Sequence, residues 1–352
     1  MKTKTFLLLP ITFLLAIFVS GCTIPGFGEF CIPGFGTCGG TVEYENDVLV
    51  IRTLDAVPST VSTGQQFRLS AWIENRGSET VPQRNLYGRA KDQKISIVLY
   101  DYCEGLFKDI KVSCLEKEDK ITAGGKEVGC NISRILPKQT IPISWTLVAN
   151  DEKTIPLQTS CTLKVYVRYP YETDSITSIT FIVYFEMQRM IAEGKFSTVS
   201  SYITEGYGPI KPYLTAEDTQ PIPVQNGQAS TTAIGFQVKN KGSGFPVYSD
   251  IIMVIETNRQ NSEIEIQPRE KQTGQAYDIG KLIFDNLTER LKPSNKMQFI
   301  GKETPKEIFP IKTPWEINLP KTATYHITTS VDYLYEFRKE IKVTIKPPKV
   351  FG

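Results

Sequence analysis

Hydrophobic and polar residues alternate along many segments of this chain. The alternation is clear in residues 67–74 and 163–169 of the first half, and again in 234–239 and 341–345 of the second half. A period of two places one face of a strand against a core and the other face in water, as in an antiparallel β-sandwich. Segments rich in Val, Ile, Tyr and Phe, interrupted by Gly, Pro and Asn, continue throughout the sequence. The pattern therefore predicts an all-β fold.

Two segments depart from this pattern. Residues 185–195 carry Met187, Met190 and Ile191 at roughly helical spacing. They predict a short element between the two halves, which is either a helix or an extension of the preceding strand. A second and weaker helical pattern covers residues 282–291.

The second half of the chain repeats motifs of the first half. Residues 73–78 correspond to residues 238–243, which lie 165 positions later, and both end in Asn-x-Gly-Ser. Such a sequence predicts a turn in which Gly can adopt a positive φ. Residues 167–172 correspond to residues 331–336, 164 positions later, so the frame is almost unchanged. We infer that each half folds as one copy of the same unit.

Each half contains about seven short predicted strands and a late strand with alternating tyrosines. Each also has a Trp that we expect in the core, Trp145 in one half and Trp315 in the other. These features resemble immunoglobulin-like sandwiches. The sequence thus predicts two immunoglobulin-like antiparallel β-sandwiches in tandem, at 43–187 and 208–347, with a linker at 188–207.

The repeated Asn-x-Gly turn also resembles that of CARDB-like domains, which are adhesion-related domains of surface proteins. The resemblance covers most of residues 43–347 and implies extracellular binding or scaffolding, with no shared catalytic residues. Each half is longer than a typical domain of this class, with insertions at 76–94, 103–138 and 257–312. These insertions leave the pairing of the strands open.

The N-terminus has the layout of a secretory signal. Lys2 and Lys4 precede an apolar run at residues 6–19, which is shorter than the about 20 residues of a membrane-spanning helix. The run ends in Val-Ser-Gly-Cys, which resembles a lipobox, and this resemblance implies that residues 1–21 are a signal peptide and that Cys22 carries lipid. The alternatives are an ordinary cleaved signal, or an uncleaved one with its lysines inside the cell.

Residues 22–42 are predicted to be a tether. The unit Ile-Pro-Gly-Phe-Gly occurs at residues 24–28 and again at 32–36, and this density of Pro and Gly opposes both helix and central strand. A spacer that holds the following domains away from a membrane is the simpler interpretation. The alternative is that Phe27 and Phe35 contact lipid or a partner.

Charge excludes one class of partner. The 352-residue chain has a formal net charge of +2, and removal of the two lysines in the signal leaves it close to neutral. No block of Lys and Arg stands out, so the counterion release that drives nucleic-acid binding is not available. We therefore expect no nucleic-acid partner.

Seven cysteines are present, and lipidation of Cys22 leaves an even number in an exported chain. Six cysteines predict three disulfides with 15 possible pairings, which sequence alone does not decide. Closeness in sequence favours the pairs Cys31–Cys38, Cys103–Cys114 and Cys130–Cys161. The chain has no Cys-x-x-Cys and a single histidine, so we expect no zinc site.

Two sequons, at Asn131 and Asn286, are candidates for glycosylation in an exported protein. They occupy comparable places in the two halves. The other explanation for this repeated Asn-containing motif is that the fold requires a turn at a strand edge there.

No catalytic motif is evident. Alternation places His326 on the outward face of its strand with Thr328, Ser330 and Asp332, where Ser330 lies about 13 Å and Asp332 about 20 Å away along the strand. A Ser-His-Asp triad within this strand is therefore excluded. The segment Gly-Gly-Lys at 124–126 lacks the spacing of a phosphate-binding loop. We expect neither enzymatic activity nor a metal or cofactor.

Trp72 is the candidate binding residue. By alternation it points away from the core, so it is either covered or offered to a partner. We favour cover by the insertion at 76–94, because a bare Trp is costly. The insertion between Cys103 and Cys130 is interpreted first as a loop held by disulfides and second as a recognition surface.

Together these features predict a membrane-tethered surface lipoprotein without catalytic activity. Its expected function is adhesion, or docking to another component of the cell envelope. Its expected partners are the membrane, through the lipid on Cys22, and another envelope protein or a glycan. The alternatives are a structural subunit of a surface layer or filament, an accessory subunit of an exported enzyme or transporter, and a hydrolase with an unrecognised site.

Overall fold

The computed structural model describes most of the chain that follows the predicted tether. The described residues are 46–83, 93–114, 120–123, 127–151, 153–225, 231–247, 252–257, 265–266, 282–283, 299–312 and 321–347. All of them belong to one compact unit, Tyr44–Gly352. The predictions made for residues 1–42, for Asn286 and for Trp315 lie outside the described residues. Within the described ranges, no helix combines the length and the apolar character needed to cross a membrane.

The described residues form three sheets. The first is β1 (Leu49–Val57), β3 (Gln66–Asn75), β8 (Thr140–Ala149) and β5 (Phe107–Ser113), in that order. The matching sheet of the second half is β11 (Ile210–Ala216), β13 (Thr231–Asn240), β18 (Glu307–Lys312) and β16 (Glu265–Ile266).

The large sheet follows the order β17 (Leu282–Ile283), β15 (Ile252–Thr257), β19 (Thr322–Lys346), β9 (Thr159–Val183), β4 (Ile95–Asp101), β7 (Glu127–Ile132) and β6 (Lys120–Ala123). Four short strands attach to its sides: β2 (Thr60–Ser62), β10 (Tyr202–Glu205), β12 (Ile222–Val224) and β14 (Phe245–Pro246).

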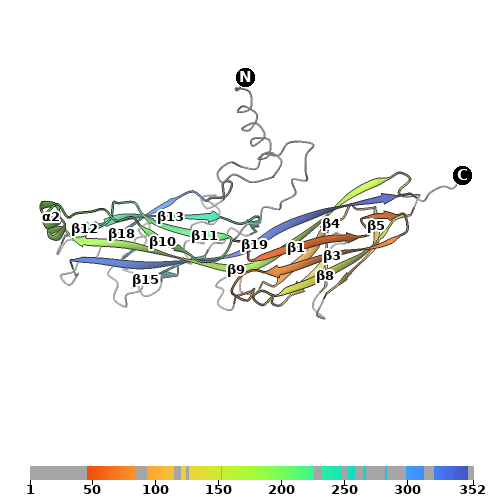
Figure 1. Cartoon of the computed structure of the whole chain (residues 1–352), viewed down its shortest axis with the longest axis horizontal. Coiled ribbons are helices and arrows are strands. Elements are labelled where there is room, and N and C mark those ends of the chain that lie inside the picture. Colours follow the sequence, from red (N-terminus) through yellow and green to blue (C-terminus); the bar gives the residue numbers. More distant parts are fainter. Residues whose placement is uncertain are drawn as a thin grey trace, which may run out of the picture. The chain divides into compact units, whose positions relative to one another are not determined.

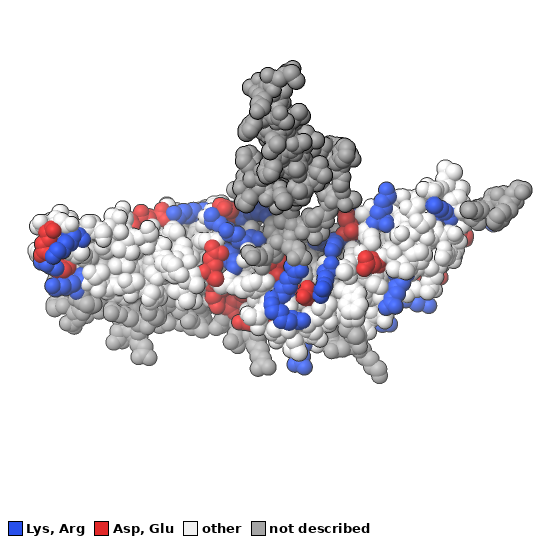
Figure 2. Space-filling view, viewed as in Figure 1, with Lys and Arg blue, Asp and Glu red and all other residues white. Residues whose placement is uncertain are grey.

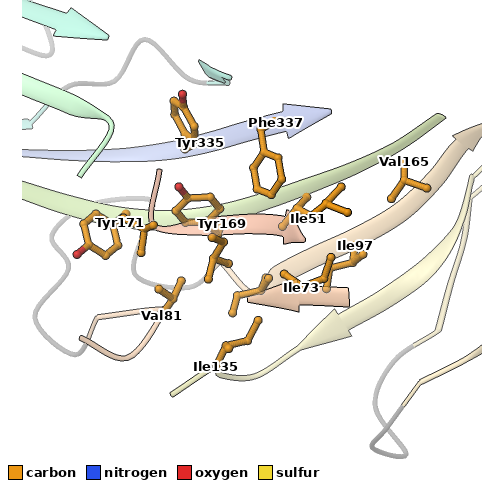
Figure 3. Packing of buried hydrophobic residues seen from close by; sticks show 14 of the residues in the cluster. Ile51, Ile73, Val81, Ile97, Ile135, Val165, Tyr169, Tyr171, Tyr335 and Phe337 are labelled. Atoms are coloured by element: carbon orange, nitrogen blue, oxygen red, sulfur yellow. The ribbon is translucent and has the colours of Figure 1, made fainter. Parts of the chain in front are cut away.

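Alternation determines which residues form the core, as the sequence predicted. In β3 the apolar residues at 67, 69, 71 and 73 are at most 2% exposed, while the residues between them are at least partly exposed. Ile73 of the smaller sheet packs near Ile97 and Val165 of the large sheet (Figure 3). The predicted all-β, sandwich-like fold is confirmed.

The two longest strands connect the halves of the molecule. β9 and β19 each have 25 residues and pair antiparallel from Thr159–Ile345 to Ile182–Thr322. The N-terminal part of β9 also pairs with β4, whereas its C-terminal part pairs with β10 and β12. Likewise, the N-terminal part of β19 pairs with β15 and its C-terminal end with β2. Each strand therefore runs from one sandwich into the other (Figure 1).

We define the first sandwich as β1-β3-β8-β5 together with β4, β6, β7, the N-terminal half of β9 and the C-terminal half of β19. The second sandwich contains β11-β13-β18-β16 with β10, β12, β15, β17 and the remaining halves of β9 and β19. Each sandwich thus includes half a strand from the other repeat. The domain ranges 43–187 and 208–347 stay a prediction. The sequence did not indicate that each sandwich would include half a strand from the other repeat.

The tyrosines of the repeat meet near the middle of the β9–β19 pair, where both strands pass from one sandwich to the other. Tyr169 pairs with Tyr335, and Tyr171 pairs with Tyr333. In the repeat, Tyr169 corresponds to Tyr333 and Tyr171 corresponds to Tyr335. Exchanging the two repeats therefore turns one pair into the other, so this junction has approximate twofold symmetry. The ring centroids are 5.8 Å apart in one pair and 6.2 Å in the other. All four rings are at most 2% exposed, and these aromatic contacts stabilise the junction.

The repeated Asn-x-Gly turn differs from the prediction. Gly77 and Gly242 are absent from the positive-φ residues of the described chain. The Asn side chain shapes each turn instead, because Asn75 Oδ1 accepts a hydrogen bond from the Gly77 amide (2.9 Å) and Asn240 Oδ1 accepts one from the Gly242 amide (3.0 Å). Gly is needed at 242 for space, since a Cβ there would collide with the hydroxyl of Tyr335.

The helical predictions have mixed outcomes. The segment between the halves is a helix, α2 (Tyr184–Ala192), one of the two structures expected there. In contrast, Leu282–Ile283 is the strand β17, so the weak helical prediction is wrong for these two residues. Pairing with β15 outweighs the local pattern there.

The predicted disulfide pairing in the body is wrong. The structure joins Cys103 to Cys161 and Cys114 to Cys130, with Cα–Cα distances of 6.0 and 6.1 Å. Cys103 follows β4, which pairs with the start of β9, and this brings it beside Cys161. Closeness in sequence failed as a guide because strand pairing brings distant cysteines together.

Candidate binding surface

The outer face of the sheet β1-β3-β8-β5 carries the candidate residue Trp72. We call it the Trp72 face and define it by the residues around Trp72 that alternate with the core positions of the three adjacent strands: Arg52, Thr53, Asp55, Arg68, Ser70, Trp72, Glu74, Pro142 and the buried Ser144. Trp72 lies on β3, the second strand of this sheet. The register places Thr53 on one side of it and Pro142 on the other. The backbone of Trp72 is therefore held between two paired strands, next to a β-bulge between Ile51 and Thr53.

Trp72 is 44% exposed, although we expected the insertion at 76–94 to cover it. The described part of that insertion turns toward other strands. Val81 forms a β-bridge with Ile135, and Gln83 accepts a hydrogen bond from the backbone amide of Glu172 (2.6 Å). Trp72 thus points outward, as alternation predicts, and remains accessible.

Polar groups surround the indole. Ser70 and Glu74 flank it along β3, and Arg68 donates a hydrogen bond to Ser144 Oγ (3.0 Å) on the neighbouring strand. Over the part of the surface where β1, β3 and β8 lie, positive and negative side chains are interspersed (Figure 2). The face therefore combines one large aromatic ring with hydrogen-bonding groups of both signs of charge.

A second cluster lies beside the four tyrosines, on the paired strands β9 and β19. Glu336 is 1% exposed and accepts hydrogen bonds from Arg168 (3.0 and 2.6 Å) and Arg338 (2.7 Å). The Arg338 guanidinium also lies 5.2 Å from the ring centroid of Tyr100 and 4.9 Å from that of Phe245. These groups satisfy one another, so we interpret the cluster as structural.

A third cluster joins the two halves beside β1. Asp47 is 3% exposed and accepts hydrogen bonds from the backbone amide of Ser243 (3.1 Å) and from its hydroxyl (2.5 Å). Burial raises the pKa of the Asp47 carboxyl, an effect that the hydrogen bonds from Ser243 partly oppose. Tyr335 adds a longer contact at 3.5 Å. The cluster fixes the entry of the chain into the first sandwich against a turn of the second.

The single histidine lies outside these clusters. His326 is exposed on β19, as predicted, and its Nδ1 is 2.9 Å from Ser178 Oγ on β9. Asp332 is 3% exposed, however, so the prediction that it points into water is wrong. Residues 331–337 are all buried, because both faces of β19 are covered where it crosses between sandwiches. In the described part of the chain, no three His, Cys, Asp or Glu residues are close enough to hold a metal ion.

Asn131 is the one predicted glycosylation site within the described residues. It lies in β7, where it pairs with Ser96 of β4 and accepts a hydrogen bond from the Ser96 hydroxyl (2.8 Å). The sequon therefore begins within a strand and not in a turn. Its glycosylation stays a prediction.

Comparisons with known proteins give no family. No family model matches the chain, and no curated protein matches it, so the resemblance to CARDB-like domains stays a prediction. Among solved structures, the C-terminal domain of the AgI/II polypeptide BspA from Streptococcus agalactiae is 10% identical, with coverage of 82% of this chain and 93% of that one, at a TM-score of 0.22. The collagen adhesin CNA from S. aureus is 10% identical, with coverage of 87% and 95%, at a TM-score of 0.11. At such scores the fold assignment rests on the strand pairing described above.

Proposed function

We propose that this chain is a non-catalytic, membrane-tethered surface protein that adheres or docks to another component of the cell envelope. The predicted lipid on Cys22 and the Pro- and Gly-rich segment 22–42 supply the attachment and the reach. A Gly-rich chain of this length has an average end-to-end distance of a few tens of Å, roughly 25 Å. The body is thereby held near the membrane with its sheet faces free to meet a partner.

The exposed Trp72 is the observation that carries the proposal. It is 44% exposed in a sheet whose inward residues are tightly packed. A large aromatic side chain held rigidly on an open sheet loses little conformational entropy on contact, which makes it a good anchor. The face spans three paired strands, so an extended partner can make contacts along their length.

Strand addition at the edge of this sheet is less well supported. One edge strand, β5, has a register irregularity between Lys108 and Lys111, and Asp109 there has a positive φ of 51°. The other edge strand, β1, has a β-bulge between Ile51 and Thr53 with an exposed Arg52. Charged residues and irregular backbone on an edge oppose pairing with another strand. We therefore place docking above the filament hypothesis.

Site-specific cross-linking on living cells tests the proposal. A photoreactive residue at position 70, next to Trp72 on the same face, is compared with one at position 202 on the second sandwich, where Tyr202 is 69% exposed. We expect position 70 to capture one envelope component and position 202 to capture little. Links mainly between copies of the chain would favour the structural alternative, and equal labelling from both positions would refute the proposal.

A further inference from the structure

The internal repeat shows that the fold does not require an aromatic residue at position 72. By register, β13 matches β3, since Asn240 lies opposite the first residue of β11 as Asn75 lies opposite the first residue of β1. Gln237 is therefore the counterpart of Trp72. Its amide nitrogen donates hydrogen bonds to Glu303 (3.1 Å) and to the carbonyl of Thr304 (3.0 Å). The second sandwich thus fills this position with a polar residue that its neighbours satisfy.

The composition of the Trp72 face decides between classes of partner. A protein interface centres on several large apolar or aromatic residues that a partner buries together. The Trp72 face has one such ring, and the residues directly beside it on β1 and β3 are small, hydroxylated or charged. The next exposed apolar side chain on this side of the sheet is Val57, 67% exposed, which lies farther along opposite Arg68. Pro142, directly opposite Trp72 on β8, extends the apolar strip by one small ring. An apolar protein anchor would find too little matching surface here.

A sugar ring matches this arrangement. One face of a pyranose presents C–H groups over an area similar to that of an indole, and its edge carries hydroxyls that both donate and accept hydrogen bonds. Trp72 offers the aromatic face, while Ser70, Glu74 and Asp55 offer partners for hydroxyls within the same three strands. A Trp side chain has only two torsion angles, so little conformational entropy is lost on stacking.

Charge narrows the class of sugar. Arg68 and Glu74 lie on opposite sides of Trp72 along β3, and Asp55 lies on β1. Arg52 is exposed at the β-bulge opposite Trp72, and Glu74 lies 3.6 Å from Arg76. Three arginines and two carboxylates leave a net charge of only +1 around the ring, which is too small to select an acidic polymer. The arrangement suits a neutral sugar.

We propose that the Trp72 face binds a neutral saccharide chain of hexose or N-acetylhexosamine units, with one ring stacked on Trp72. This proposal rests on the docking function above and names the chemistry of the docking partner. The row of polar residues along the strands provides contacts for the neighbouring sugars of the chain.

The test compares the full-length protein in detergent with the Trp72→Gln variant, which carries the residue found at the equivalent position of the second sandwich. The probes are neutral hexose and N-acetylhexosamine oligosaccharides of about four to six rings, and binding is measured by titration calorimetry. We expect binding by the wild type and a loss of about tenfold or more in affinity for Trp72→Gln. The matched control, Tyr202→Ala, removes an aromatic ring that is 69% exposed on the second sandwich and should bind as wild type does.

A parallel assay on isolated cell envelopes separates the two proposals. Binding that survives protease treatment, is lost after periodate oxidation of sugar diols and is lost in Trp72→Gln supports the saccharide proposal. Envelope binding that is equal in wild type and Trp72→Gln overturns the saccharide proposal while the docking function stands. Binding to neither envelopes nor oligosaccharides refutes both.

Discussion

Replacement of Ile345 by Ala tests whether the second half of the sequence completes the first sandwich. Ile345 is 0% exposed near the end of β19 and lies between Thr159 of β9 and Val61 of β2. Loss of a buried Ile side chain costs about 2–5 kcal/mol, because transfer energy is lost and a cavity remains. That free energy corresponds to an increase of about 30-fold to a few thousandfold in the population of opened states.

The same strand provides a matched control. Ile327 is 1% exposed in the N-terminal half of β19, where it pairs with Thr177. Ile327→Ala removes the same atoms from the same strand, but in the second sandwich. Native-state hydrogen exchange followed by mass spectrometry reports each sandwich separately, through peptides from β3 and β8 for the first and from β11 and β13 for the second.

We expect Ile345→Ala to accelerate exchange in β3 and β8 at least as strongly as in β11 and β13. Ile327→Ala should have its larger effect in β11 and β13. If Ile345→Ala leaves β3 and β8 unchanged and affects only the second sandwich, the strand exchange between the halves is refuted.

Three further predictions follow from the same contacts. Residues 44–187 expressed alone should not fold, because they lack the segment 335–346 with its four buried apolar or aromatic side chains. Burial of these side chains contributes about 6–12 kcal/mol to the stability of the fold. A cooperative thermal transition by circular dichroism would contradict this prediction. Burial raises the pKa of Asp47 above its ordinary value of 3.8, so the folded state binds this proton more tightly than the unfolded chain does. The stability of wild type relative to Asp47→Asn should then be greatest below about pH 4 and decrease as the pH rises through the raised pKa. Urea titrations that show the opposite slope would exclude this mechanism. Peptide mapping without reduction should recover a peptide in which Cys103 is joined to Cys161. Replacement of both cysteines by Ala should lower the free energy of unfolding by about 2–5 kcal/mol. A peptide that joins Cys103 to any other cysteine would disprove the pairing.

The candidate surface was partly accessible from the sequence. Alternation alone placed Trp72 on the outward face of its strand, because the side-chain period of a strand is fixed. It did not indicate whether the neighbouring insertion would cover the indole, and our preference for cover did not hold in the described residues. Whether a loop covers the indole depends on where the loop packs. The hydrogen bond from the Glu172 amide to Gln83 joins residues far apart in sequence, so no local pattern predicts it.

The clusters of polar residues at the junction of the two sandwiches were not predicted either, because they also depend on contacts between distant parts of the chain. Asp47, Ser243 and Tyr335 are far apart in sequence and meet because two repeats join there. The repeat itself gave one signal, since the alternating tyrosines of both halves occur at the same offset. That signal identified equivalent residues but not their contact with one another.

The sequence by itself determined what local periodicity controls: the all-β character, the inward and outward faces of strands such as β3, and the repeated motifs of the two halves. It located the segment of α2 but left open whether that segment is a helix or an extension of the strand before it. Only the tertiary structure decided which strand pairs with which. Backbone hydrogen bonds between strands are the same for every sequence, so the pairing depends on the total burial achieved by the whole chain. For this reason the sequence showed two repeats but not the exchange of β9 and β19 between them, nor the cysteine pairs that this pairing brings together.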